Sequence, residues 1–168
     1  GPDYMMKGGL GSASMLLADG ALVGAIVVVN ALGDVIDPQT QQVVAGTRST
    51  GNAQTPGDPA YMPDNPFGNT TIAVVATSAA LTKEQVNKVA QMAHDGLAQA
   101  IRPAHTMFEG DTVFALALGP SSQTLHSSPL AAAQVSAIGA AAAATLARAI
   151  VKAVRHASTL HGIPAINS

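Results

Sequence analysis

The chain has 168 residues, which is enough for one domain with a buried core. A net charge of −2 and only 11% charged residues argue against nucleic acid or an anionic membrane as an electrostatic partner. The absence of cysteine excludes disulfides and thiolate metal sites. The opening Gly1-Pro2-Asp3 lacks the basic and apolar segments of a signal peptide, so we expect a cytoplasmic protein.

The first predicted element is a β-hairpin over 10–30. Two apolar runs flank Ala18-Asp19-Gly20, and Asp-Gly is a strong signal for a two-residue turn. The second run, 21–29, is almost entirely apolar, which is typical of a strand covered on both faces. A short strand pair is predicted over 34–44. The Gly-, Pro- and Asn-rich segment 45–69 predicts a long exposed loop, and such loops are often functional or processed.

Strands and helices alternate after this loop. The apolar runs 71–77 and 112–118 predict two buried strands. Between them, Thr82 and Gln85 form a capping box that starts a helix ending near residue 101. This order predicts a mixed α/β domain with helices on at least one face of a largely buried sheet.

A second helix is predicted from Ser128 and Pro129, an N-cap and first-turn proline, to about residue 156. Its segment 130–146 is uncharged and close to the length of a membrane span. Most of this segment is alanine, which adds little transfer free energy. We therefore interpret it as a buried helix of a protein without a membrane partner.

Motifs for metal, cofactor or phosphate chemistry are weak. The segment KGGLGSAS lacks the phosphate-binding pattern G-x-x-x-x-G-K-[ST] and precedes a strand instead of a helix, and the serine-hydrolase pattern G-x-S-x-G does not occur. We expect no cofactor and no metal ion. The five histidines form neither H-x-x-x-H nor HExxH; they are His94, His105, His126, His156 and His161.

Thr70 stands where the long loop meets a predicted strand. A threonine hydroxyl needs a base to act as a nucleophile, and the residue's own α-amine can serve once the chain is cut before it. The flexible loop and the small pair Gly68-Asn69 suit such a cut. Two other interpretations stay open. Threonine also fits an ordinary start of a strand, and Asn69-Thr70-Thr71 formally matches a glycosylation signal.

Glu109-Gly110-Asp111 places two carboxylates immediately before a predicted buried strand. Two acids this close could hold an ammonium group or shift each other's pKa. A solvated turn is the alternative interpretation.

Four motifs in order, GGLGSAS, VVVN, GNTTIAVVAT and HTMFEGDTVFALA, resemble the DmpA-type aminopeptidase family. The family includes L-aminopeptidase/D-esterases and β-peptidyl aminopeptidases. The Asn-Thr-Thr junction is most similar to the branch of nylon-oligomer (6-aminohexanoate oligomer) endohydrolases, whose nucleophile is threonine. The resemblance implies an αββα sandwich like that of N-terminal-nucleophile hydrolases and of ornithine acetyltransferases, of which this chain would be the C-terminal portion.

The resemblance also implies roles for particular residues. Self-cleavage between Asn69 and Thr70 would leave an α part, 1–69, and a β part, 70–168, with Thr70 as nucleophile and α-amine base. Asn30 matches the family asparagine that donates to the oxyanion. Glu109 and Asp111 match the pair that orients the nucleophile, although both are aspartates in the nylon-hydrolase branch.

Partners and substrates follow from the same resemblance. Family members carry a further N-terminal portion with a functional Lys or Tyr, so we expect that portion and a tetramer of αβ units as partners. The substrate would be a small amide or oligoamide. Aminopeptidase activity on N-terminal amino acids, acyl transfer of the ornithine acetyltransferase type and a non-catalytic remnant are the alternatives.

Overall fold

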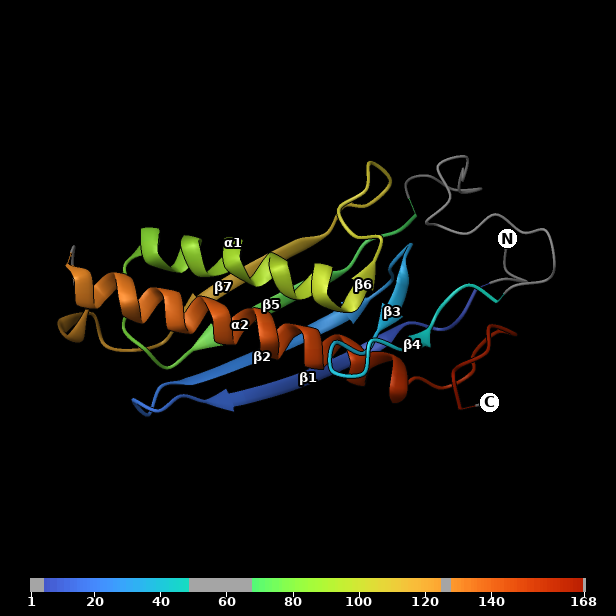
Figure 1. Ribbon diagram of the computed structural model, residues 1–168, viewed down its shortest axis with the longest axis horizontal. Coiled ribbons are helices and arrows are strands. Elements are labelled where there is room, and N and C mark those ends of the chain that lie inside the picture. The colour runs from blue at the N-terminus through green and yellow to red at the C-terminus, as the bar shows by residue number, and fades with distance from the viewer. Residues whose placement is uncertain (1–4, 49–67, 125–127, 168) are drawn as a thin grey trace.

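A four-stranded sheet forms the centre of the molecule (Figure 1). This computed structural model describes residues 5–48, 68–124 and 128–167. The hairpin β1–β2 and the pair β2–β5 are antiparallel, whereas β5 and β7 are parallel, and the sheet order is β1-β2-β5-β7. Because parallel neighbours need a crossover, helix α1 (Lys83–Ala100) lies in the connection from β5 to β7. The strands are β1 (Gly9–Leu16), β2 (Leu22–Val29), β5 (Ile72–Thr77) and β7 (Thr112–Ala117).

The local signals in the sequence are confirmed. Gly20 has a φ of +86°, as the Asp-Gly turn of the hairpin requires. In the capping box, the Thr82 hydroxyl accepts from the Gln85 N–H and the Gln85 side chain accepts from the Thr82 N–H. The Ser128 hydroxyl caps helix α2 (Pro129–Arg155) by accepting from a backbone N–H in its first turn.

A second, smaller sheet lies beside one end of the main sheet, in the order β4-β3-β6. Its strands β3 (Asp34–Ile36) and β4 (Val43–Ala45) confirm the predicted strand pair. Strand β6 (Ile101–Arg102) was not predicted, because it uses the two residues that directly follow α1. Most of the predicted long loop, 49–67, lies outside the described residues.

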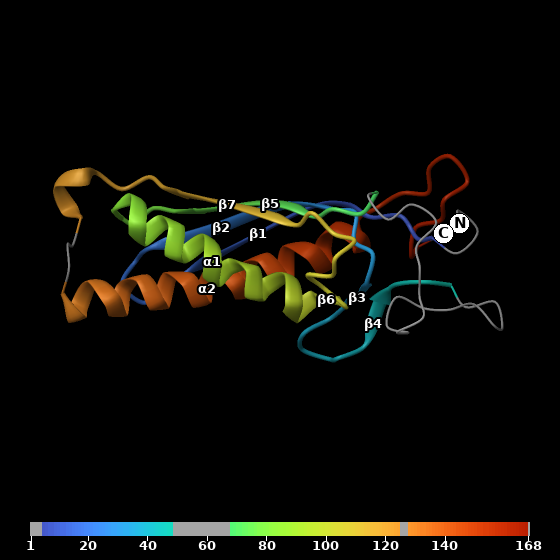
Figure 2. The ribbon, with the colours of Figure 1, turned by 90° about the horizontal axis from the view of Figure 1, so that it is seen from above.

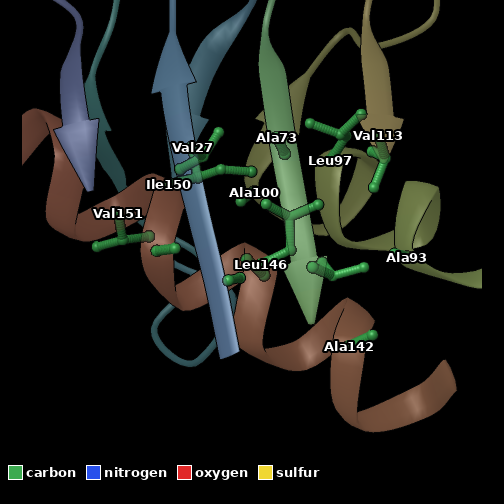
Figure 3. Packing of buried hydrophobic residues seen from close by; sticks show 14 of the residues in the cluster. Val27, Ala73, Ala93, Leu97, Ala100, Val113, Ala142, Leu146, Ile150 and Val151 are labelled. Atoms are coloured by element: carbon green, nitrogen blue, oxygen red, sulfur yellow. The ribbon is translucent and has the colours of Figure 1, made fainter. Parts of the chain in front are cut away.

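Both helices lie side by side on one face of the main sheet (Figure 2). Small side chains make this close packing possible, since Ala93, Ala100 and Ala142 are fully buried. The larger core side chains fill the space between helices and strands (Figure 3); they include Val27, Leu97, Leu146 and Ile150.

Helix α2 is the one helix in the described part of the chain that is long and apolar enough to cross a membrane by length and composition. In this fold it packs on the sheet, and 56% of its most apolar window is buried. Its apolar character is therefore explained by the core, as the sequence predicted.

Gly96 on α1 sets the approach of the two helices. A methyl group there would run into the backbone carbonyl of Ala143 on α2. Helix propensity alone predicts that Gly96→Ala stabilises the protein by about 1 kcal/mol. We expect the opposite sign, a loss of about 1–3 kcal/mol, because the helices must separate. Denaturant unfolding measures the difference.

Gly139→Ala is the matched control, since Gly139 is also inside a helix at the same interface. There the two nearest atoms to the added methyl group are Sδ and Cε of Met92, the flexible end of a side chain that can rotate, and only its Cβ at 3.0 Å has to shift with the helix. We expect this variant to be close to neutral or more stable. Equal stabilisation by both substitutions would show that the helix spacing is not set at Gly96.

The described residues leave the second face of the main sheet largely uncovered. The almost wholly apolar segment 21–29 was predicted to be covered on both faces, and this was wrong for the chain as described: in β2, buried and exposed side chains alternate. We call the exposed side the open face. Its large apolar side chains are each about half or more exposed, and a contiguous group of this kind is unusual on a surface in contact with water. They are Leu10, Leu16, Leu22, Ile26, Val28, Ile72, Phe114 and Leu116.

Candidate active site

One end of the main sheet brings the predicted site residues together. Strand β2 runs antiparallel to β5, and β5 runs parallel to β7. The end of β2 therefore meets the starts of the other two strands. Asn30 follows β2, Thr70 precedes β5 and Asp111 precedes β7. An isolated parallel bridge between Asn69 and Glu109 extends the β5–β7 pairing to this end.

Thr70 is half-buried, and its hydroxyl lies against the peptide bond that precedes it. The Oγ1 atom donates a hydrogen bond of 2.6 Å to the Asn69 carbonyl oxygen. The Thr70 N–H donates to the Asn30 carbonyl oxygen at 2.9 Å. The neighbouring Thr71 differs, because its side chain is fully buried. Of the two threonines, only Thr70 presents its hydroxyl at the Asn69–Thr70 bond.

Asn30 contacts the same segment through both its side chain and its main chain. Its side-chain amide donates to the Gly68 carbonyl oxygen at 2.7 Å, one residue before the carbonyl of Asn69. The side chain of Asn30 thus holds the chain ahead of the Asn69–Thr70 bond, and its main chain holds Thr70. The role at an oxyanion remains a prediction.

Glu109 fixes the loop before β7. Its Oε2 accepts from both the N–H and the hydroxyl of Thr106, each at 3.1 Å. Its Oε1 accepts from the Leu32 N–H at 3.4 Å. Through these bonds the carboxylate ties this loop to the segment that follows β2. Orientation of the nucleophile by Glu109 stays a prediction.

Asp111 lies closer to the junction. Its Oδ1 accepts from the Thr71 N–H at 2.7 Å, whereas its Oδ2 is buried without a hydrogen-bond partner. Burial raises the pKa of Asp111; the Thr71 N–H opposes this shift, and the charge of Glu109 adds to it. A carboxylate with a raised pKa and a free oxygen is the kind of group that active sites use.

The raised pKa of Asp111 predicts how stability depends on pH. Between the unfolded and the higher folded pKa, the folded state binds more protons, so ionisation of Asp111 destabilises the fold as pH rises. We expect Asp111→Asn to raise the Tm by a few degrees at pH 7 and to lose this advantage as pH falls toward 4. Thermal unfolding on chains that also carry Thr70→Val, with the junction expected to stay intact, measures it.

Asp37→Asn is the control with the opposite sign. The Gln39 N–H and the guanidinium of Arg155 lower the pKa of Asp37, and the ion pair measures 2.8 Å. A lowered pKa contributes stability above the unfolded value that is lost as pH falls. We expect Asp37→Asn to lower the Tm at pH 7. Shifts of the same sign in both variants would contradict the assignment for Asp111.

Two histidines lie close together near this end of the sheet, which the sequence did not indicate. His94 on α1 and His105 in the loop before β7 have ring centroids 5.5 Å apart. Burial lowers the pKa of His94, and His105 lowers it further. Within the described residues, no group of three or more His, Cys, Asp or Glu side chains could hold a metal ion. His126 lies outside the described residues.

The four-stranded sheet with both helices on one face makes this chain an α/β protein, and its fold is like that of the N-terminal-nucleophile hydrolases. An L-aminopeptidase D-Ala-esterase/amidase from Ochrobactrum anthropi, described as a variant of that fold, superposes with a TM-score of 0.59 at 22% identity over 90% of this chain and 41% of its own. The sequence model of peptidase family S58 matches residues 3–166, and the chain belongs to this family.

Proteins similar in sequence and in structure support this membership. A protein named an aminopeptidase from Mycobacterium leprae is 42% identical over 95% of this chain and 48% of its own length. A 6-aminohexanoate-oligomer endohydrolase from Paenarthrobacter ureafaciens is 32% identical over 64% of this chain and 32% of its own. A β-aminopeptidase from Burkholderia superposes with a TM-score of 0.56 at 26% identity, over 92% of this chain and 44% of its own. The chain spans about half the length of the mycobacterial relatives it matches.

Proposed function

We propose that this chain is the C-terminal part of an autoproteolytic amide hydrolase whose nucleophile is Thr70. The observation that carries the proposal is the position of the Thr70 hydroxyl, 2.6 Å from the carbonyl oxygen of the peptide bond before it. A hydroxyl held against the carbonyl group that it must attack already has the proximity that the reaction needs. Residues 1–69 would then form the α part, and 70–168 the β part.

Self-cleavage would proceed through an ester. Thr70 Oγ1 bonds to the Asn69 carbonyl carbon, the C–N bond to Thr70 breaks, and the hydroxyl proton ends on the released nitrogen. Water then hydrolyses the ester, so that Asn69 gains a carboxylate and Thr70 regains its hydroxyl. The released α-amine is a base with an unperturbed pKa of about 7.7–8.0, suited to neutral pH.

The mature site would use the groups that the cut sets free. When the segment ending at Asn69 leaves, the Asn30 amide loses its bond to Gly68 and can donate to the oxyanion of a substrate. Asp111 would keep the start of β5 in place through the Thr71 N–H. Glu109 would keep the adjoining loop in place.

The names of the relatives favour two substrate classes. One group is named for aminopeptidase activity and the other for hydrolysis of 6-aminohexanoate oligomers. Both reactions break a linear amide through the same chemistry at Thr70. We therefore propose a peptide-like amide or a nylon-type oligoamide as the substrate. Acyl transfer to an amine would use the same acyl-enzyme with a different acceptor.

The open face indicates where a further portion of the protein would pack. This chain spans about half of its mycobacterial relatives, and one side of its sheet exposes a row of large apolar side chains. We propose that an N-terminal portion of the same protein covers the open face and gives the αββα sandwich. Tetramers of such αβ units are part of the same proposal.

Mass measurement of the full-length protein under denaturing conditions tests the function. Two fragments that meet between Asn69 and Thr70 are expected, and the purified protein should release product from amino-acid amides or from 6-aminohexanoate oligomers. An active preparation in which every chain is intact would refute the proposal.

A further inference from the structure

The carbonyl oxygen of Asn69 has two hydrogen-bond donors. One is the Thr70 hydroxyl at 2.6 Å, and the other is the backbone N–H of Gly110 at 3.3 Å. The Asn30 amide, which the family resemblance assigns to an oxyanion, donates instead to Gly68. The uncut chain therefore presents a donor at the Asn69 carbonyl that the sequence did not indicate.

The two donors do not stay equivalent during self-cleavage. When Thr70 Oγ1 bonds to the carbonyl carbon, it loses its proton and can no longer donate to the oxygen. Negative charge grows on that oxygen at the same moment. Of the two donors, the Gly110 N–H is the one that remains. A donor aimed at the atom where charge develops lowers the barrier of the step.

We propose that the backbone N–H of Gly110 is the oxyanion donor for self-cleavage. The inference rests on the proposed function, because it concerns the same bond. It assigns different steps to the two hydrogen-bond donors, the Gly110 N–H and the Asn30 amide. Gly110 serves the Asn69 carbonyl in the uncut chain, whereas the Asn30 amide is occupied by Gly68 until the cut has been made.

Neighbouring contacts hold the Gly110 N–H in place on both sides. Glu109 is anchored by Thr106 and Leu32, and Asp111 is anchored by the Thr71 N–H. The Thr112 hydroxyl also donates to the Gly110 carbonyl oxygen at 3.0 Å. A donor fixed in this way needs little reorganisation when the charge appears. The two carboxylates thus act as positioning groups for the residue between them.

A steric reason explains why residue 110 is a glycine. A Cβ at residue 110 would lie 3.2 Å from the Thr70 Oγ1 atom, closer than such contacts ordinarily are. Any other residue would press on the attacking hydroxyl. Glycine therefore allows the N–H and the nucleophile to lie against the same carbonyl group.

Replacement of Gly110 by glycolic acid in the full-length protein tests the proposal, because it changes the N–H to an ester oxygen and adds no atoms. We expect the rate constant of self-cleavage to fall on the order of 10²-fold. Gly119→glycolic acid is the matched control. Its N–H also donates to a backbone carbonyl, that of Ala79 at 3.2 Å, at the far end of β7. This control is expected to cleave at the wild-type rate.

Gly110→Ala gives a second measurement, since it keeps the N–H and adds only the crowding methyl group. We expect a smaller loss of rate than with glycolic acid. Self-cleavage at the same rate in both glycolic acid variants would overturn the assignment. A wild-type chain that never cleaves would instead refute the proposed function.

Discussion

Thr70→Val is expected to leave one uncut polypeptide and to lower amide hydrolysis on the order of 10⁶-fold, the scale seen when a hydrolase loses its nucleophile. Valine keeps the β-branched shape of threonine but has no hydroxyl to attack Asn69. It also leaves residue 70 inside the chain, so no α-amine is released to act as a base. The same substitution removes the 2.6 Å hydrogen bond to the Asn69 carbonyl. Denaturing mass measurement and product release give the two readouts.

Thr71→Val is the matched control one residue further on. The Thr71 hydroxyl is buried without a hydrogen-bond partner, so its loss removes an unsatisfied polar group. We expect normal cleavage and an equal or higher Tm. Fragments that still meet at Thr70 in the Thr70→Val protein would exclude Thr70 as the nucleophile. Loss of cleavage in Thr71→Val alone would move the role to Thr71.

Ile26→Asp is expected to have the second largest effect, because it places a carboxylate in the middle of the open face. Ile26 is 47% exposed here and pairs with Ser12 on β1 and Val74 on β5. If an N-terminal portion covers this face, an unpaired charge is buried at a penalty of several kcal/mol. We expect the full-length protein to lose its assembled form and its self-cleavage. Size-exclusion chromatography and the yield of fragments measure both.

Leu130→Asp separates this effect from a general effect of charge. Leu130 is also a large exposed apolar residue, but it lies in the first turn of α2, outside the open face. An acidic residue there interacts favourably with the helix dipole. We expect normal assembly and cleavage. Normal assembly of the Ile26→Asp protein would show that the open face is not a buried interface.

Several local features could be predicted from the sequence because they depend on neighbours in the chain. The turn at Asp19-Gly20 requires a residue that tolerates positive φ, and the capping box at Thr82 uses a side chain three residues away. The alanine-rich helix α2 is predicted to be buried, and its buried side chains pack in the core against the main sheet. The family motifs indicate Asn30, Thr70 and Asp111 as site residues without showing that they lie close together.

Other features could not be predicted because they depend on contacts distant in sequence. The apolar run of β2 does not reveal whether one or both of its faces are covered by residues of this chain. The pairing of β2, β5 and β7 decides that the Asn30 amide meets Gly68 and that the Gly110 N–H meets Asn69. His94 and His105 also come together only when α1 packs beside the start of β7.

The sequence by itself determined the strands of the main sheet, the approximate helix ends and the family, since local chemistry and ordered motifs specify them. Only the tertiary structure decided which groups face the Asn69–Thr70 bond. Hydrogen bonds are short and directional, so a shift of one residue in strand register would take the Gly110 N–H away from that carbonyl. The contact between the Gly110 N–H and the Asn69 carbonyl therefore follows from how the sheet is assembled, and the sequence alone does not indicate it.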